Sequence, residues 1–155
     1  MKITILCVGK IKEAFYQDAL AEYAKRLLGY CTFEIIEVPD EKNLAGQEPQ
    51  ILDKEGQRLL ARFPEHAYAV ALCIDGKERS SLQLADWLKT RMDQGDSHLV
   101  FVIGGSVGLA PAVINHCQER MSFSKLTFPH HLMRVILAEQ IYRSFRIIRG
   151  EPYHK

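Results

Sequence analysis

The sequence predicts an α/β fold, built as a mostly parallel β-sheet with helices on both faces. Short β-branched runs alternate with amphipathic stretches along the whole chain, which is typical of parallel strands joined by helices. One run, LVFVI at 99–103, is apolar throughout, as expected of a central strand covered on both faces. Glycines follow three of the apolar runs, at Gly9, Gly76 and Gly104. Ligands of such sheets bind where strands end, so these turns are the predicted floor of a site.

The strands are predicted in chain order from their β-branched and aromatic residues. They are 3–8, 32–38, 68–74, 99–103 and 125–128. The last one mixes hydroxyl and apolar side chains and ends at Pro129, which removes a backbone donor and turns the chain. Its hydroxyl residues leave two interpretations open, because they either finish an edge strand or present polar groups to a ligand.

Helices are predicted where apolar residues recur every three or four positions. They cover 12–28, 48–63 and 81–92, with a short helix after the glycine-rich loop and a last helix from about His131 to Arg149. The last helix carries an apolar stripe that predicts either core or a subunit interface. The stripe consists of Met133, Leu137, Ile141, Phe145 and Ile148. We take the dimer interface as the hypothesis to test, with Ile141→Asp expected to give monomers. Residues 39–49 are expected to form a surface loop.

Composition predicts one soluble domain, residues 1–155, because 47% of the residues are apolar and 25% are charged. The net charge of +1 conceals a basic carboxyl-terminal end, where six Lys and Arg residues after Met121 face two Glu residues. A polyanion is therefore a possible partner. The four cysteines are far apart and are expected to be reduced and buried. The amino-terminal apolar run is too short for a signal peptide or membrane span, so we expect a cytoplasmic protein.

The segment FVIGGSVGL at 101–109 predicts a loop whose bare backbone lies close to a ligand. Its spacing matches neither the dinucleotide fingerprint nor the nucleoside-triphosphate loop. Two other features are weaker. His130 and His131 suggest a metal, but adjacent helical residues do not share a face and no carboxylate has ligand spacing, so we expect none. Lys10, after Gly9, is a minor candidate for a ligand contact.

Several segments, in this order, resemble the ribosomal RNA large subunit methyltransferase H family. They are MKITILCVGKIKE, EYAKRL, DKEGQRLL, FVIGGSVGL and MSFSKLTFPHHLMRVILAEQIYRSFRIIRGEPYHK. The match covers essentially the whole chain, with Met121 where leucine is common. Its most specific part is a GG-x-x-G loop followed by S-x-S-K-x-T-x-P-H, E-Q-x-Y-R and a terminal P-Y-H.

The resemblance implies a SPOUT-like fold with a carboxyl-terminal trefoil knot, a homodimer, and S-adenosylmethionine as methyl donor. It implies methylation at N3 of a pseudouridine in 23S large-subunit ribosomal RNA, which we expect on assembled ribosomes. The donor-binding residues that it implies are Leu72, Gly104, Phe123, Ser124, Lys125, Leu126, Thr127 and Phe128. This donor has no phosphate, so the glycine loop needs no phosphate motif. Gly104→Val is expected to weaken donor binding with little loss of fold.

The catalytic task in such an enzyme is to position the reactants and to remove the N3 proton. The tail residue His154 is the predicted base, and Tyr153 is predicted to stack on the target base. Arg134 or Arg143 is the alternative, as a partner of the imide anion or of a phosphate. A competing interpretation is a noncatalytic α/β module that binds a nucleotide or the ribosome. It explains the sheet and the glycines, but not the Tyr153–His154 tail.

Overall fold

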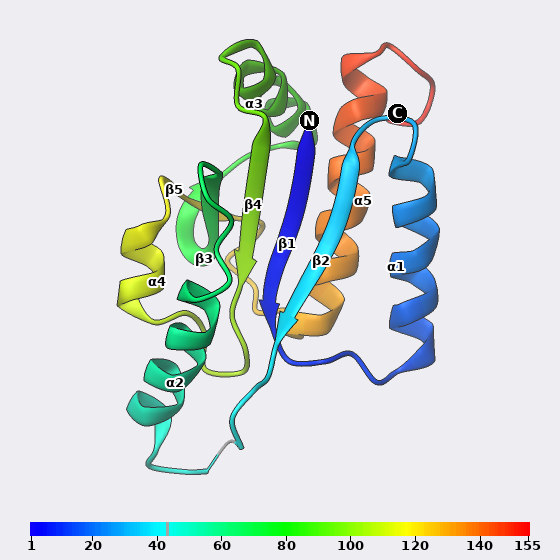
Figure 1. Cartoon of the computed structure of the whole chain (residues 1–155). Coiled ribbons are helices and arrows are strands. Elements are labelled where there is room, and N and C mark those ends of the chain that lie inside the picture. The colour runs from blue at the N-terminus through cyan, green and yellow to red at the C-terminus, as the bar shows by residue number, and fades with distance from the viewer. Residues whose placement is uncertain (43) are drawn as a thin grey trace.

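A computed structural model describes residues 1–42 and 44–155, whose strands form a five-stranded sheet (Figure 1). The strands are β1 (Lys2–Val8), β2 (Thr32–Val38), β3 (Tyr68–Glu78), β4 (His98–Ile103) and β5 (Glu119–Ser122). Their order is β2-β1-β4-β3-β5, and every neighbouring pair is parallel. The predicted parallel sheet is therefore confirmed, with β4 in its centre.

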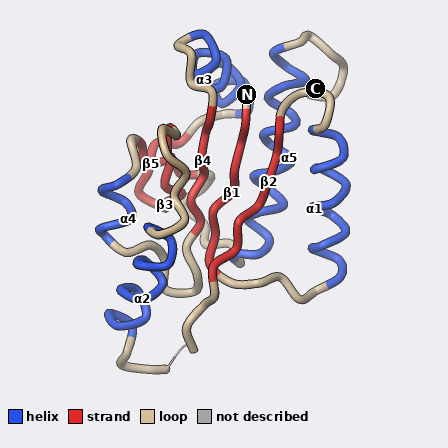
Figure 2. The backbone as a smooth tube through the Cα atoms, in the orientation of Figure 1, coloured by secondary structure: helices blue, strands red, loops and turns tan. Residues whose placement is uncertain are grey.

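Helices cover both faces of the sheet (Figure 2). They are α1 (Ala14–Leu27), α2 (Glu48–Leu60), α3 (Ser81–Asp93), α4 (Pro111–His116) and α5 (His130–Ile148). The first, third and fifth pack together on one face, and α2 and α4 lie on the other. These elements agree with the predicted helices to within a few residues at their ends.

The core consists of two apolar layers, because successive strand residues point to opposite faces. In β1, Ile3 and Ile5 face α1, α3 and α5, whereas Leu6 and Val8 face α2 and α4. The stripe on α5 belongs to the first layer: Leu137, Ile141 and Phe145 are at most 3% exposed. The prediction that this stripe is a dimer interface is wrong, because the sheet of the same chain already covers it.

The predicted strand at 125–128 is also wrong, since the fifth strand ends at Ser122 and residues 123–129 form a loop. The hydroxyl side chains hold this loop instead of alternating along a strand. Ser122 Oγ donates to the Ser124 carbonyl at 3.0 Å, and Leu126 N–H donates to Ser124 Oγ at 3.0 Å. Such local bonds compete with strand pairing and favour a turn.

Three further expectations concern the loop at 39–49, the cysteines and membrane-spanning segments. Within the predicted loop at 39–49, residue 43 lies outside the described residues, and most of the others are exposed. All four cysteines are free, but only Cys7 is fully buried, and burial raises its pKa to about 12. None of the helices in the described part of the chain is both long and apolar enough to cross a membrane.

Candidate active site at the carboxyl edge of the sheet

A cavity of about 170 Å³ lies beside β3 and β4, between the glycine-rich loop and the loop that follows β5. Its wall comes from three segments that are far apart in sequence: residues 72–74, 103–109 and 121–133. In β3 the pairing register with β5 shifts between Leu72 and Lys77, and this irregularity exposes Cys73 and Ile74 to the cavity. Strand ends in parallel sheets are where ligands bind, so this cavity is the candidate active site.

Most of the residues expected to bind the donor lie in this one cavity. The seven that line it are Leu72, Gly104, Phe123, Ser124, Leu126, Thr127 and Phe128. Lys125 is exposed and does not line it. The structure thus brings together three segments that the sequence could only relate through the family resemblance.

Gly104 is required by its own loop. A Cβ atom on Gly104 would lie 2.5 Å from the carbonyl carbon of Gly108, a separation that real Cβ atoms do not reach. The loop closes here through a 3.1 Å hydrogen bond from Gly108 N–H to the Gly105 carbonyl, with Gly108 at φ +84°. The expectation that Gly104→Val leaves the fold nearly intact is therefore wrong, because the side chain meets backbone before it meets ligand space.

A buried carboxylate lies behind the glycine-rich loop. Glu55 on α2 is 3% exposed, and its Oε1 atom would lie 3.1 Å from a Cβ atom on Gly105. Its Oε2 atom accepts the N–H of Glu41 at 3.0 Å, and burial raises the pKa of the carboxyl. Glu55 was not predicted from the sequence, although its spacing from Ile51 and Leu59 places it on the buried face of α2.

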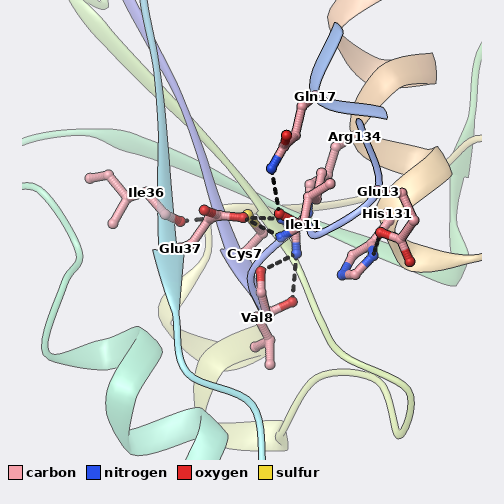
Figure 3. A network of polar contacts seen from close by, with 10 residues as sticks. Cys7, Val8, Ile11, Glu13, Gln17, Ile36, Glu37, His131 and Arg134 are labelled. Atoms are coloured by element: carbon pink, nitrogen blue, oxygen red, sulfur yellow. Dashed lines mark hydrogen bonds and ion pairs between the residues drawn. The ribbon is translucent and has the colours of Figure 1, made fainter. Parts of the chain in front are cut away.

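Arg134, a predicted catalytic residue, is fully buried beneath the turn that follows β1 (Figure 3). Its guanidinium donates to Glu37 Oε2 at 2.8 Å and to the carbonyls of Val8 and Gly9 at 2.6 and 2.8 Å. Glu37 Oε2 also accepts the N–H of Ile11 at 3.0 Å. We therefore withdraw Arg134 as a contact for an imide anion or a phosphate, because its side chain is inaccessible and already bonded.

His130 lines the cavity, a position that the sequence analysis did not anticipate. It is half-buried, and burial together with the neighbouring His131 lowers the pKa of its imidazole. His131 instead pairs with Glu13, with 3.6 Å between Nδ1 and Oε2. Across the described ranges, no three His, Cys, Asp or Glu side chains are grouped as a metal site would require. The signal for His130 was its place directly after Pro129, where the last loop meets α5.

The tail lies at the opposite end of α5 from the cavity (Figure 1). The Tyr153 ring lies 4.9 Å from the Tyr142 ring, and its hydroxyl donates to Glu139 Oε1 at 3.1 Å. His154 Nδ1 lies 3.2 Å from Arg143 Nη1, whose guanidinium also pairs with Glu139. At 1.5 Å per helical residue, Arg143 is roughly 20 Å along α5 from His130. The tail of one chain therefore does not reach that chain's own cavity.

Comparison with known proteins defines the class to which this fold and cavity belong. The family model described as "Predicted SPOUT methyltransferase" matches residues 1–154. The chain therefore belongs to the SPOUT methyltransferase family and is a methyltransferase.

Individual similar proteins carry more specific names than the family model. The chain is 52% identical, over 159 residues that span 100% of both chains, to "Ribosomal RNA large subunit methyltransferase H" of Listeria monocytogenes serovar 1/2a (strain ATCC BAA-679 / EGD-e). It is 49% identical to the protein of the same name from Bacillus pumilus (strain SAFR-032), again over 100% of both. Among solved structures, a probable methylase family protein from Haemophilus influenzae Rd KW20 matches with a TM-score of 0.59. That match has 10% identity and covers 99% of this chain and 70% of the other, so it supports the fold alone.

Proposed function

We propose that this methyltransferase transfers a methyl group from S-adenosylmethionine to N3 of a pseudouridine in 23S large-subunit ribosomal RNA. We place the reaction in the cytoplasm, on assembled ribosomes. The observation that carries the proposal is the convergence of seven expected donor-binding residues on one cavity at the carboxyl edge of the sheet. The two relatives of about 50% identity, whose names specify ribosomal RNA of the large subunit, support the substrate class.

The residues that line the cavity fit such a donor. Leu72, Phe123 and Phe128 supply apolar surface for an adenine ring, and the glycine-rich loop presents backbone groups with no side chains in front of them. The bound donor supplies an electrophilic methyl group on its sulfonium. At about 170 Å³ the cavity is smaller than the roughly 300 to 1,000 Å³ typical of ligand pockets. Leu126, which is 70% exposed at the rim, belongs to the loop that we expect to close over the ligand.

A homodimer is part of the proposal, because Tyr153 and His154 lie at the end of α5 that is remote from their own cavity. We place the tail of one subunit over the cavity of the other. There the imidazole of His154 accepts the N3 proton and the Tyr153 ring stacks on the target base. Arg143, which contacts both tail residues, is the alternative group for stabilising the imide anion.

The α5 stripe is core, so the dimer needs another apolar surface. Ile74 and Leu126 are 56% and 70% exposed, and both line the cavity. Burying this surface between subunits would bring a second chain to the mouth of the cavity. The single domain of residues 1–155 and the trefoil knot complete the proposal, and both rest on family membership and on the likeness in fold.

Mass spectrometry of ribosomal RNA tests the reaction directly. RNA from a strain that lacks this gene should lose one N3-methylated pseudouridine, and the wild-type chain should restore it. His154→Ala should restore it at a rate lower by about a hundredfold, partly recovered at higher pH. Calorimetry should show binding of S-adenosylmethionine and not of NAD or ATP. Donor binding without any change in the RNA would instead favour the noncatalytic module.

Mixed dimers test the subunit arrangement. One subunit lacks residues 153–155, and the other carries Thr127→Trp, which fills the cavity from an exposed position. If the tail crosses, the tail of the Thr127→Trp subunit completes the open cavity of the tailless subunit, and the mixture is active. Inactive mixtures with intact donor binding would show that each tail serves its own subunit.

A further inference from the structure

A row of four aromatic rings runs from the protein surface to the cavity. It begins at Phe15, which is 64% exposed at the start of α1 and whose ring centroid lies 4.4 Å from that of Tyr16. Tyr16 is 6.3 Å from His131, which in turn is 4.3 Å from His130. His130 lines the cavity. We call Phe15, Tyr16, His131 and His130 the ring row.

Two cations precede Phe15 in the turn that leads into α1. Lys10 and Lys12 are exposed, and among the described residues neither has an ion-pair partner. The nearby acid, Glu13, is paired with His131 at 3.6 Å. Asp18 and Asp40 are also exposed and likewise have no ion-pair partner among the described residues, so the positive charge is confined to the turn that carries Lys10 and Lys12.

The backbone between these lysines is held in place from below (Figure 3). Arg134 donates to the Gly9 carbonyl at 2.8 Å, Ile11 N–H donates to Glu37 at 3.0 Å, and Gln17 Nε2 donates to the Ile11 carbonyl at 2.9 Å. Ile11 is buried, so its neighbours Lys10 and Lys12 are turned outward. The fold thus presents a fixed turn with two cations, followed by an exposed ring that the rest of the ring row connects to the cavity.

We propose that the ring row, with Lys10 and Lys12, binds single-stranded RNA next to the target nucleotide, a neighbouring base stacking on Phe15 and its phosphates meeting the lysines. Single-stranded nucleic acid is bound by aromatic platforms beside positive charge, and this surface has both. A second copy of the chain fits less well, because an interface here would bury two lysines without partners. The inference rests on the proposed function, since it names how the same site holds its substrate.

Phe15→Ala is the first test, with Leu28→Ala at the other end of α1 as the matched control, because Leu28 is 79% exposed and remote from the ring row. Affinity for large ribosomal subunits and for a fragment of 23S RNA should fall about tenfold for Phe15→Ala, within the range for a lost stacked base. The affinity for S-adenosylmethionine should not change. Phe15→Trp should keep the RNA affinity, and Leu28→Ala should behave as wild type.

The lysines are tested through salt dependence. Replacing Lys10 and Lys12 with Gln should reduce the slope of log K against log salt by about 1.4, at roughly 0.7 for each lost phosphate contact on a single strand. Lys25→Gln, an exposed control near the far end of α1, should leave the slope unchanged.

Three results would overturn the inference: unchanged RNA affinity in Phe15→Ala, an equal loss of donor affinity, or dissociation of the dimer in sedimentation, which would make Phe15 a subunit contact. Failure of the proposed function looks different. In that case the wild-type chain leaves pseudouridine unmethylated, whereas direct binding of the RNA fragment still reports on Phe15 and the lysines.

Discussion

Replacing Arg134 with Met should destabilise the protein by about 3 kcal/mol. Met fills most of the space of the side chain but removes three hydrogen bonds, to Glu37, Val8 and Gly9. Each of the two carbonyls left without a donor costs about 1 kcal/mol or more, and the lost bond to a carboxylate about 1.5. The Glu37 side chain is 34% exposed, so water solvates part of its unpaired charge. Relief from burying the guanidinium offsets some of the loss, which leaves the total near 3 kcal/mol.

Urea unfolding of Arg134→Met and of Arg143→Met measures this difference. Arg143 lies on the same helix, but its side chain is 23% exposed and pairs at the surface, so its replacement should cost less than about 1 kcal/mol. A loss below 1 kcal/mol for Arg134→Met would refute the structural role. If that variant were as stable as wild type but bound RNA poorly, Arg134 would have to reach the substrate, as the sequence analysis first suggested.

The remaining predictions concern the core, the tail and the buried acid. Ile141→Asp should give unfolded or aggregated chains in circular dichroism, because it buries a charge at a position only 3% exposed, and a folded monomer would contradict this. Tyr153→Ala should lower the free energy of unfolding by about 1 to 2 kcal/mol, since it removes the ring contact with Tyr142 and the bond to Glu139; Tyr153→Phe should keep the ring contact. Unfolding of Tyr153→Ala at the wild-type urea concentration would contradict this role of the tail. Glu55 has a pKa above its ordinary value of 4.5, so its contribution to stability is fully present below that pH and is lost as the pH rises through the folded-state value. Glu55→Gln should remove that part of the pH dependence in thermal unfolding, and identical profiles for the two proteins would show that Glu55 titrates normally.

The sequence predicted the four long strands and the main helices because each has a continuous apolar run or apolar residues at regular spacing. β4 is apolar from Leu99 to Ile103, and the apolar positions of α2 and α5 recur at helical spacing. The fifth strand was misplaced because ERMS at 119–122 has no such period, and its pairing with β3 depends on tertiary contacts across an irregular register. In SFSKLTF, polar and apolar residues alternate as they would in a strand. The serine hydroxyls there form local hydrogen bonds within a loop, and periodicity alone does not separate the two cases.

The candidate site was predictable only in part. Local pattern indicated the glycine-rich loop, and family motifs indicated the loop after β5. Arg134 was misjudged because a buried arginine is rare, although its spacing from Leu137, Ala138 and Ile141 placed it on the buried stripe of α5. Glu55 was missed because a buried glutamate is equally rare, although its position also falls on the buried face of α2. Both residues contact backbone that is distant in sequence, and no local period specifies such a partner.

The hydrogen bonds from Arg134 to the end of β1 can form only late in the synthesis of the chain. The guanidinium and the Val8 carbonyl that it caps are 126 positions apart, so the first turn stays open until nearly the whole polypeptide has been made. Contacts of such long separation close late and slow the folding of a domain. A nascent chain that terminates before the last helix would also lack His130 and Met133 from the cavity wall. Premature products therefore lack part of the cavity wall, and only the completed chain presents the whole site.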